Sequence, residues 1–122
     1  MLWWRDRVSF DGEFFHLDEV SSFPHPQAPL PIHIGGSSRA AARRAAARGD
    51  GYFPGGALTP DERAAQWELA RSGGALEYTR WASIDLSPEA VASYEAQGVT
   101  RLVVTTPDLD ELTQFAKRLG LG

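Results

Sequence analysis

The sequence predicts an α/β fold built from four consecutive β-α units. Short apolar runs bounded by glycine and proline alternate with longer segments of helical spacing. Serine or threonine stands before each helical segment and glycine after it, as at helix ends. The strand runs are brief and apolar, which is typical of parallel strands covered on both faces. Four such units form either a small open sheet or half of a (β/α)8 barrel, which takes about 250 residues.

Length and composition indicate a single domain, residues 1–122. The net charge of −4 gives no general electrostatic reason to expect nucleic acid or an anionic membrane as a partner. No apolar run approaches the roughly 20 residues that span a bilayer. Cysteine is absent, which excludes disulfides, thiolate metal sites and cysteine nucleophiles, and fits a cytoplasmic protein.

Residues 1–31 are predicted to form a β-hairpin followed by a linker. Asp11-Gly12 lies between residues 8–10 and 13–17, and this dipeptide suits a type I′ turn because glycine accepts a positive φ. Two strands alone are marginal in water, so we expect the hairpin to lie against something else. The linker is predicted to be extended because of its prolines, which are Pro24, Pro26, Pro29 and Pro31.

The first β-α unit consists of a strand at residues 32–34 and a helix at residues 39–48. Ser37 or Ser38 is expected to cap this helix, and Gly49 to end it as a C′ residue. Small side chains on one arc allow close approach to a sheet, and the arginines are expected to form a solvated face. The alanines are Ala41, Ala42 and Ala45, and the arginines are Arg39, Arg43, Arg44 and Arg48.

The other three units follow the same pattern. Thr59, Pro60 and Glu62 form a capping box with proline at the first helical position, so a helix is expected from there to about Arg71. The remaining strands are expected at residues 50–53, 77–86 and 101–105. A third helix is expected to open at residues 87–89 and close at Gly98, and a fourth to open at residues 106–108 and stop at Gly120.

The turn made by Gly35, Gly36, Ser37 and Ser38 is the strongest site for an anion. It lies between a strand end and a helix N-terminus, where backbone N–H groups are unpaired and the helix dipole is positive. Glycine lets a phosphate approach the backbone, and serine hydroxyls add donors. The alternative is a plain β-α turn with a serine cap. The turn lacks the lysine of a P-loop and the third glycine of a dinucleotide-binding fingerprint.

Other polar residues give weaker signals. The three histidines, His16, His25 and His33, do not fall at metal-ligand spacing, so no metal site is predicted. His33 points away from its isoleucine neighbours, either as a hydrogen-bonded structural residue, which we favour, or toward a ligand in a barrel interior. Asp50 is expected to cap or brace the neighbouring turn.

Arg80 and Trp81 alternate on their strand, so one of them is expected to face the interior of the sheet or barrel. Arg80 either holds an anionic group or reaches solvent near the strand end, and we favour the second interpretation. Neither a Ser-His-Asp arrangement nor a pair of carboxylates is evident, so no catalytic residue is predicted.

Residues 31–38, with the helix and strand that follow as far as residue 54, resemble the bacterial luciferase-like monooxygenase family. They are most similar to the branch that uses the deazaflavin F420. The family characteristically has a strand and turn of the form P-P-I-x-I-G-G-S-S, a helix of the form A-x-R-R-A-A and a strand beginning G-D-G. Further similarity lies in residues 2–3, 8–15, 24–26 and 98–104.

The resemblance implies a TIM-like barrel that binds F420, or alternatively FMN, at the carboxyl ends of its strands. It also implies that Gly35, Gly36, Ser37 and Ser38 help to hold the cofactor phosphate, and that Phe53 and Gly55 lie near the same site. A small-molecule substrate would then be oxidised or reduced by hydride transfer, or by oxygen activation in the flavin branch.

The chain matches only the C-terminal half of this family. We therefore expect residues 32–122 to form a (β/α)4 half barrel, preceded by the hairpin insertion and linker of residues 1–31. On this interpretation the chain is the C-terminal portion of a flavin- or F420-dependent oxidoreductase and is incomplete as a stand-alone catalyst. The alternative is a non-catalytic half barrel that forms a homodimer or pairs with a separate N-terminal half, because a half barrel leaves two strand edges unpaired.

Overall fold

The computed structural model describes residues 5–74 and 76–121, and the chain divides into two compact units, Met1–Leu30 and Pro31–Gly122. The division falls beside the predicted boundary between the linker and the first β-α unit. In the first unit, β1 (Val8–Asp11) and β2 (His16–Val20) pair in antiparallel fashion, with Phe10 opposite Leu17. The prediction that residues 1–122 form a single domain stays a prediction.

The turn between β1 and β2 differs from the predicted type I′ turn. Gly12 N–H donates to the Phe15 carbonyl over 3.0 Å, so residues 12–15 form the loop and the second strand begins at His16, not at residue 13. Gly12 has no positive φ. A Cβ at Gly12 would lie 2.5 Å from the exposed Phe10 ring, so glycine here gives room to that ring and does not supply a left-handed conformation.

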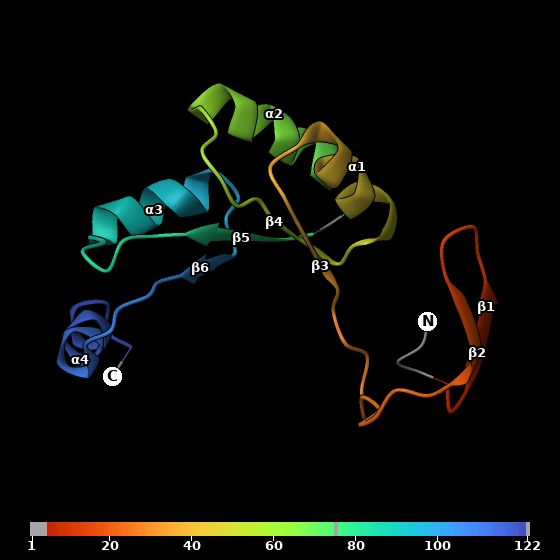
Figure 1. The fold of residues 1–122 in the computed structure, drawn as a ribbon. Helices are drawn as coiled ribbons and strands as arrows, with labels where there is room; N and C mark the ends of the chain where they lie inside the picture. The colour runs from red at the N-terminus through yellow and green to blue at the C-terminus, as the bar shows by residue number, and fades with distance from the viewer. Residues whose placement is uncertain (1–4, 75, 122) are drawn as a thin grey trace. The chain divides into compact units, whose positions relative to one another are not determined.

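The second unit is a parallel four-stranded sheet whose strand order follows the chain (Figure 1). Its strands are β3 (His33–Gly35), β4 (Gly51–Phe53), β5 (Glu77–Trp81) and β6 (Arg101–Val103). The helices that follow them are α1 (Arg39–Arg48), α2 (Pro60–Arg71), α3 (Pro88–Ala96) and α4 (Leu109–Arg118). The predicted α/β fold is thus confirmed, whereas closure into half of a barrel stays a prediction.

Two strands are shorter than predicted. The strand expected at residues 77–86 ends at Trp81, because the chain then turns, with Leu86 N–H donating to the Ser83 carbonyl over 3.2 Å. The strand expected at residues 101–105 ends at Val103. Trp81 and Val103 are the last paired residues of β5 and β6. In both strands, apolar residues follow this last pair in the sequence.

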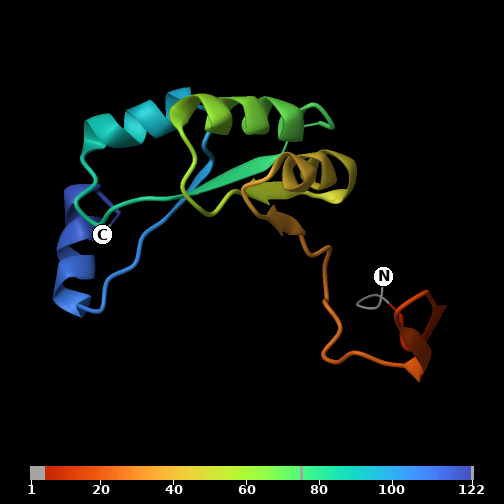
Figure 2. The same cartoon turned by 45° about the horizontal axis from the view of Figure 1, so that its top comes forward.

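The core lies between one face of the sheet and α1, α2 and α3, which cover the same face in both ribbon views (Figures 1 and 2). Tyr52 and Tyr78 are fully buried, and the Trp67 ring of α2 stacks on Tyr78 with ring centroids 4.2 Å apart. The predicted small-residue face of α1 is confirmed, since Ala41, Ala42 and Ala45 are all buried. No helix among the described residues is long and apolar enough to cross a membrane.

Gly49 ends α1, but not in the predicted left-handed conformation. Its φ is −102° and its N–H donates to the Ala45 carbonyl over 2.9 Å. A Cβ at Gly49 would lie 2.9 Å from Ile34 Cγ1 and 3.0 Å from the Ala45 oxygen. Glycine is required here because α1 and β3 approach each other closely, and not because of a positive φ.

The predicted capping box of α2 is present. The Thr59 hydroxyl accepts from Glu62 N–H over 3.3 Å, and the Glu62 carboxylate accepts from Thr59 N–H over 2.9 Å. Both orphan donors are satisfied, which fixes the start of the helix. The hydrogen bond from the Thr59 backbone, and after it that from the Thr59 hydroxyl, lowers the pKa of Glu62.

We expect Glu62→Gln to remove part of the acid sensitivity of folding. A carboxyl whose pKa is lowered in the folded state stabilises that state above its unfolded pKa, and this stabilisation is lost as the pH falls through the folded pKa. Urea unfolding from about pH 7 to about pH 3 would measure the effect. Glu68→Gln is the matched control on the same helix, and an equal acid response in the two variants would contradict the expectation.

Candidate functional site

The four residues predicted to hold an anion form the connection between β3 and α1, named here the β3–α1 turn (residues 35–38). Gly35 ends β3 opposite Phe53 of β4, and Gly36 has a φ of +112°, which favours glycine. Ser38 is the N-cap, since its hydroxyl oxygen accepts from Ala41 N–H over 3.1 Å. The structure thus decides between the two serines that the sequence allowed as caps.

Two buried side chains fix the carbonyl groups of the β3–α1 turn. The Tyr52 hydroxyl shares its one proton between two acceptors, the Gln66 side-chain oxygen at 2.8 Å and the Gly36 carbonyl oxygen at 3.1 Å. The Gln66 amide nitrogen donates to the Ser37 carbonyl over 3.0 Å. Because N–H and C=O point in opposite directions across a trans peptide, the Ser37 and Ser38 N–H groups point away from these buried side chains.

The loop after β4 lies against the β3–α1 turn. Gly56 has a φ of +88°, which favours glycine, and a Cβ there would lie 2.7 Å from the Ser37 hydroxyl oxygen, so the loop lies close to Ser37. A Cβ at Gly55 would meet nothing within 4 Å, which leaves open space beside this backbone. The structure therefore places Gly35, Phe53 and the loop that contains Gly55 close together, while the prediction that they form one cofactor site stays a prediction.

The electrostatics of the turn suit an anion. The first turn of α1 holds no acidic residue, and its first N–H groups have no acceptor within the helix. These groups and the helix dipole place partial positive charge at the turn. Burial, and after it the neighbouring Tyr78, raises the pKa of Tyr52, which keeps its hydroxyl protonated as a donor.

Sequence reasoning missed Tyr52, Gly56 and Gln66 as supports of this turn. The doubled glycine after β4 was a signal for Gly56, because adjacent glycines permit close backbone approach. Gln66 stands four residues before the buried Ala70 on the inner side of α2, so a polar residue on an apolar arc was the signal there.

A second cluster of polar residues lies at the amino ends of the strands, away from the β3–α1 turn. Glu77 Oε2 lies 2.9 Å from His33 Nε2 and 2.8 Å from an Arg101 nitrogen. Gly51 makes room for the histidine, since a Cβ there would lie 2.6 Å from the ring. His33 is thus part of a polar cluster that links β3, β5 and β6, which favours a structural position, but no hydrogen bond of its ring is evident among the described residues.

Arg80 and Trp81 lie on opposite faces of β5, but Trp81, and not Arg80, is the exposed residue. Trp81 is 51% exposed and its ring centroid lies 5.3 Å from that of Phe53 on β4. Arg80 is only 8% exposed and does not reach solvent freely. The preference for a solvated Arg80 was wrong because α3 covers this part of β5, with the guanidinium carbon 5.5 Å from the Tyr94 ring centroid.

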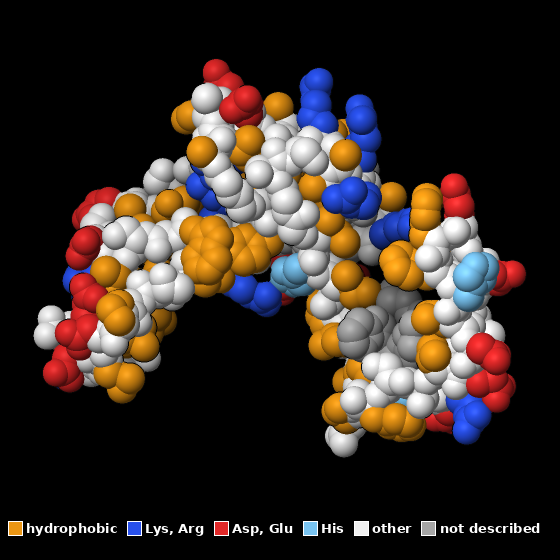
Figure 3. All heavy atoms as spheres, viewed as in Figure 1, with side chains coloured by type: hydrophobic (Ala, Val, Ile, Leu, Met, Phe, Trp, Pro, Cys, Tyr) orange, Lys and Arg blue, Asp and Glu red, His pale blue; other side chains and the backbone are white. Residues whose placement is uncertain are grey.

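The remaining predicted residues have structural positions. Asp50 Oδ2 accepts from Ile32 N–H over 2.8 Å, which confirms its predicted bracing role at the start of β3. The arginines of α1 are exposed, as predicted, and blue side chains project over this helix in Figure 3. Within the ranges that the structure covers, no group of three or more His, Asp or Glu residues could hold a metal ion.

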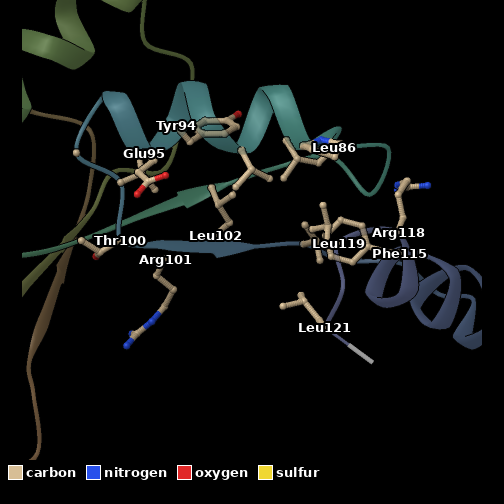
Figure 4. A pocket seen from close by; sticks show the side chains of 15 residues that line it. Leu86, Tyr94, Glu95, Thr100, Arg101, Leu102, Phe115, Arg118, Leu119 and Leu121 are labelled. Atoms are coloured by element: carbon tan, nitrogen blue, oxygen red, sulfur yellow. The ribbon is translucent and has the colours of Figure 1, made fainter.

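A cavity of about 810 Å³ lies between α3, β6 and α4 and contains none of the predicted site residues. Figure 4 shows that Leu102 points from β6 toward α3, while Arg101 points to the other side of the strand. Phe115 and Leu119 line it from the α4 side. Its lining is mainly apolar and its position differs from that of the β3–α1 turn.

Comparison with known proteins identifies relatives. The chain is 40% identical over 52 residues to an F420-dependent glucose-6-phosphate dehydrogenase of Nakamurella multipartita, which covers 43% of this chain and 15% of that protein. It is 46% identical over 57 residues to the uncharacterized protein Mb0965c of Mycobacterium bovis, covering 47% of this chain and 19% of that one. The matched segment thus spans less than a fifth of the length of these curated relatives.

Among solved structures, an F420-dependent secondary alcohol dehydrogenase in complex with an F420-acetone adduct is similar at 17% identity and a TM-score of 0.47. That similarity covers 98% of this chain and 49% of that protein. The sequence profile of the luciferase-like monooxygenase family matches residues 1–97, which is most of the 122-residue chain. The chain therefore belongs to the luciferase-like monooxygenase family.

Proposed function

We propose that this chain is the C-terminal portion of a luciferase-like, F420-dependent oxidoreductase and contributes the turn that binds the cofactor phosphate. The observation that carries the proposal is the β3–α1 turn itself. Its carbonyl groups are hydrogen-bonded inward by Tyr52 and Gln66, which leaves the N–H groups of Ser37 and Ser38 directed outward. F420 is the first choice because relatives with 33–41% identity are named F420-dependent dehydrogenases, and FMN is the alternative.

Each residue of the site has a role that follows from its position. The N–H groups at the start of α1 would donate to phosphate oxygens, and the Ser37 hydroxyl would add a further donor. Gly36 supplies the φ of +112° that the turn needs, and Gly55 leaves space for a ligand beside the β4 loop. Phe53 and Trp81 offer aromatic surface at the carboxyl ends of β4 and β5. The cofactor would supply the hydride chemistry, while these residues bind and orient it.

We expect Gly55→Asp to weaken F420 binding at least about tenfold, because it adds a negative charge beside the proposed phosphate site. The side chain fits without strain, since a Cβ at Gly55 meets nothing within 4 Å. Gly55→Lys places a positive charge at the same position and should preserve or improve binding. The measurement is a titration of the 122-residue chain with F420 and, separately, with FMN, followed by cofactor fluorescence.

Ala92→Asp is the matched control, because it adds the same charge at an exposed position of α3. Equal affinities for Gly55→Asp and Ala92→Asp would refute the assigned site. Amide NMR spectra recorded during the titration give a second measure, since Gly35 and Gly36 should shift first. Absence of binding at about 1 mM cofactor would refute binding by this chain alone.

A second function, association through the sheet, is supported by the face that α1, α2 and α3 leave uncovered. Trp81 lies half-exposed on that face, and β3 and β6 each pair with a single strand among the described residues. Parallel sheets are normally covered on both faces, and open edges attract further strands. We propose that the chain is a half barrel that pairs with a second copy or with a separate N-terminal half, in the cytoplasm. A strictly monomeric, folded chain in sedimentation experiments would refute the homodimer.

A further inference from the structure

Arg80 is a buried cation for which no carboxylate or hydrogen-bond partner is evident in the described part of the chain. Its side chain extends from β5 under α3, and the residue is 8% exposed. The guanidinium carbon lies 5.5 Å from the centroid of the Tyr94 ring, which is a cation–π contact. Its Nη1 atom is buried and makes no hydrogen bond within residues 5–74 and 76–121.

This arrangement is unusual because a buried charge is costly unless it is paired and hydrogen-bonded. Three other arginines of the described chain lie close to a carboxylate, and these are Arg7 at Glu19, Arg71 at Glu68 and Arg101 at Glu77. No ion pair joins Arg80 to an acidic residue among the described positions. An anion from outside the chain would supply the missing partner.

A cleft between α2 and α3 contains Arg80 and has the right composition for an anion. Its volume is about 520 Å³, and the residues with polar side chains that line it are Arg63, Arg80, Ser93, Tyr94 and Gln97. Within the described residues, no aspartate or glutamate lines this cleft. Arg63 donates one of its N–H groups to the Leu58 carbonyl over 2.8 Å, which holds its side chain in place and leaves its other donors available.

We propose that this cleft binds a phosphate group, held by Arg80 and Arg63. A guanidinium group can bind two phosphate oxygens in a planar, bidentate geometry. Two guanidinium groups balance the charge of a phosphate dianion. The cleft is within the size range of small-molecule sites, about 300–1,000 Å³, so the phosphate is carried by a small organic molecule or enters as the free ion. The site shares no residue with the β3–α1 turn and does not depend on the proposed cofactor role.

The test is thermal unfolding of the full chain with inorganic phosphate or glycerol phosphate, against sodium chloride of equal ionic strength. A ligand at about ten times its dissociation constant should raise the melting temperature of the wild-type chain by about 5 °C or more. Arg80→Met should abolish this rise and, without phosphate, should melt no lower than the wild type, since it removes an unpaired buried charge. Arg44→Met, at an exposed position of α1, should keep the rise.

Several results would overturn the proposal. They are the absence of a phosphate-specific rise in the wild type, and an equal rise in Arg80→Met. If Arg80→Met fails to fold, Arg63→Met replaces it and should lower the affinity at least about tenfold. Gly55→Asp should keep the full rise in melting temperature, because Gly55 lies beside the β3–α1 turn and not at this cleft. If Gly55→Asp loses the rise and Arg80→Met keeps it, the phosphate binds at the β3–α1 turn instead. A larger rise with glycerol phosphate than with the free ion identifies the ester as the preferred ligand.

Discussion

Tyr52→Phe is expected to lower the free energy of unfolding by about 1–3 kcal/mol, because it leaves a buried amide oxygen of Gln66 without its donor. The same change removes the hydrogen bond to the Gly36 carbonyl, so the β3–α1 turn should also loosen. Urea unfolding measures the first effect, and amide hydrogen exchange at Gly36 and Ser37 measures the second. Tyr94→Phe is the control, since its ring packs on the core but no hydrogen bond of its hydroxyl is evident among the described residues.

Tyr52→Phe should also change how the free energy of unfolding depends on pH in the alkaline range. The pKa of Tyr52 is raised in the folded state, first by burial and then by Tyr78. A raised pKa contributes stability that is complete below the unfolded value of about 10 and is lost as the pH rises through the folded value. Wild type should therefore lose stability more steeply than Tyr52→Phe above about pH 10, and parallel profiles would contradict this assignment.

Gly73→Ala is expected to destabilise the fold by about 1–3 kcal/mol or more, through steric overlap between α1 and the end of α2. A Cβ at Gly73 would lie 1.9 Å from the backbone oxygen of Ala46 and 2.6 Å from its carbonyl carbon. Backbone atoms cannot rotate away as a side chain can, so the two helices would have to separate. The melting temperature and the urea midpoint would both fall.

Gly55→Ala is the matched control for this substitution. The Cβ that it adds meets nothing within 4 Å and the position has no positive φ, so its effect should stay within about 0.5 kcal/mol. Equal stabilities for the two variants would mean that α1 and α2 tolerate a wider spacing than the structure shows. Ala46 would then be the position at which to look for the adjustment.

Features governed by neighbouring residues in the chain could be predicted from the sequence. The capping box of Thr59 and Glu62, the cap on α1 and the bounds of α1 itself follow from contacts that span a few residues. The same is true of the parallel β-α order, which needs only the alternation of short apolar runs and helical spacing. The geometry of the β3–α1 turn belongs to this class, because strand, glycine and helix are consecutive, while its role in binding an anion stays a prediction.

Features governed by distant contacts could not be predicted in the same way. Arg80 is buried because α3 crosses it, and nothing beside it in the sequence indicates this. Gly12 and Gly49 were interpreted through backbone conformation, whereas neither has a positive φ, and the close approach of Ile34 explains the glycine at position 49. Gln66 supports a turn 29 residues away in the chain, a contact that depends on the packing of α2 beside α1.

The order of the strands bears on how the second unit assembles. Because β3, β4, β5 and β6 lie side by side in the order in which they occur, each β-α unit adds to the edge left by the one before it. No strand has to enter between two that are already paired. Such a topology allows stepwise assembly in the order of the chain, and each parallel pairing closes a loop that contains a helix, which makes it slower than a contact between neighbouring residues.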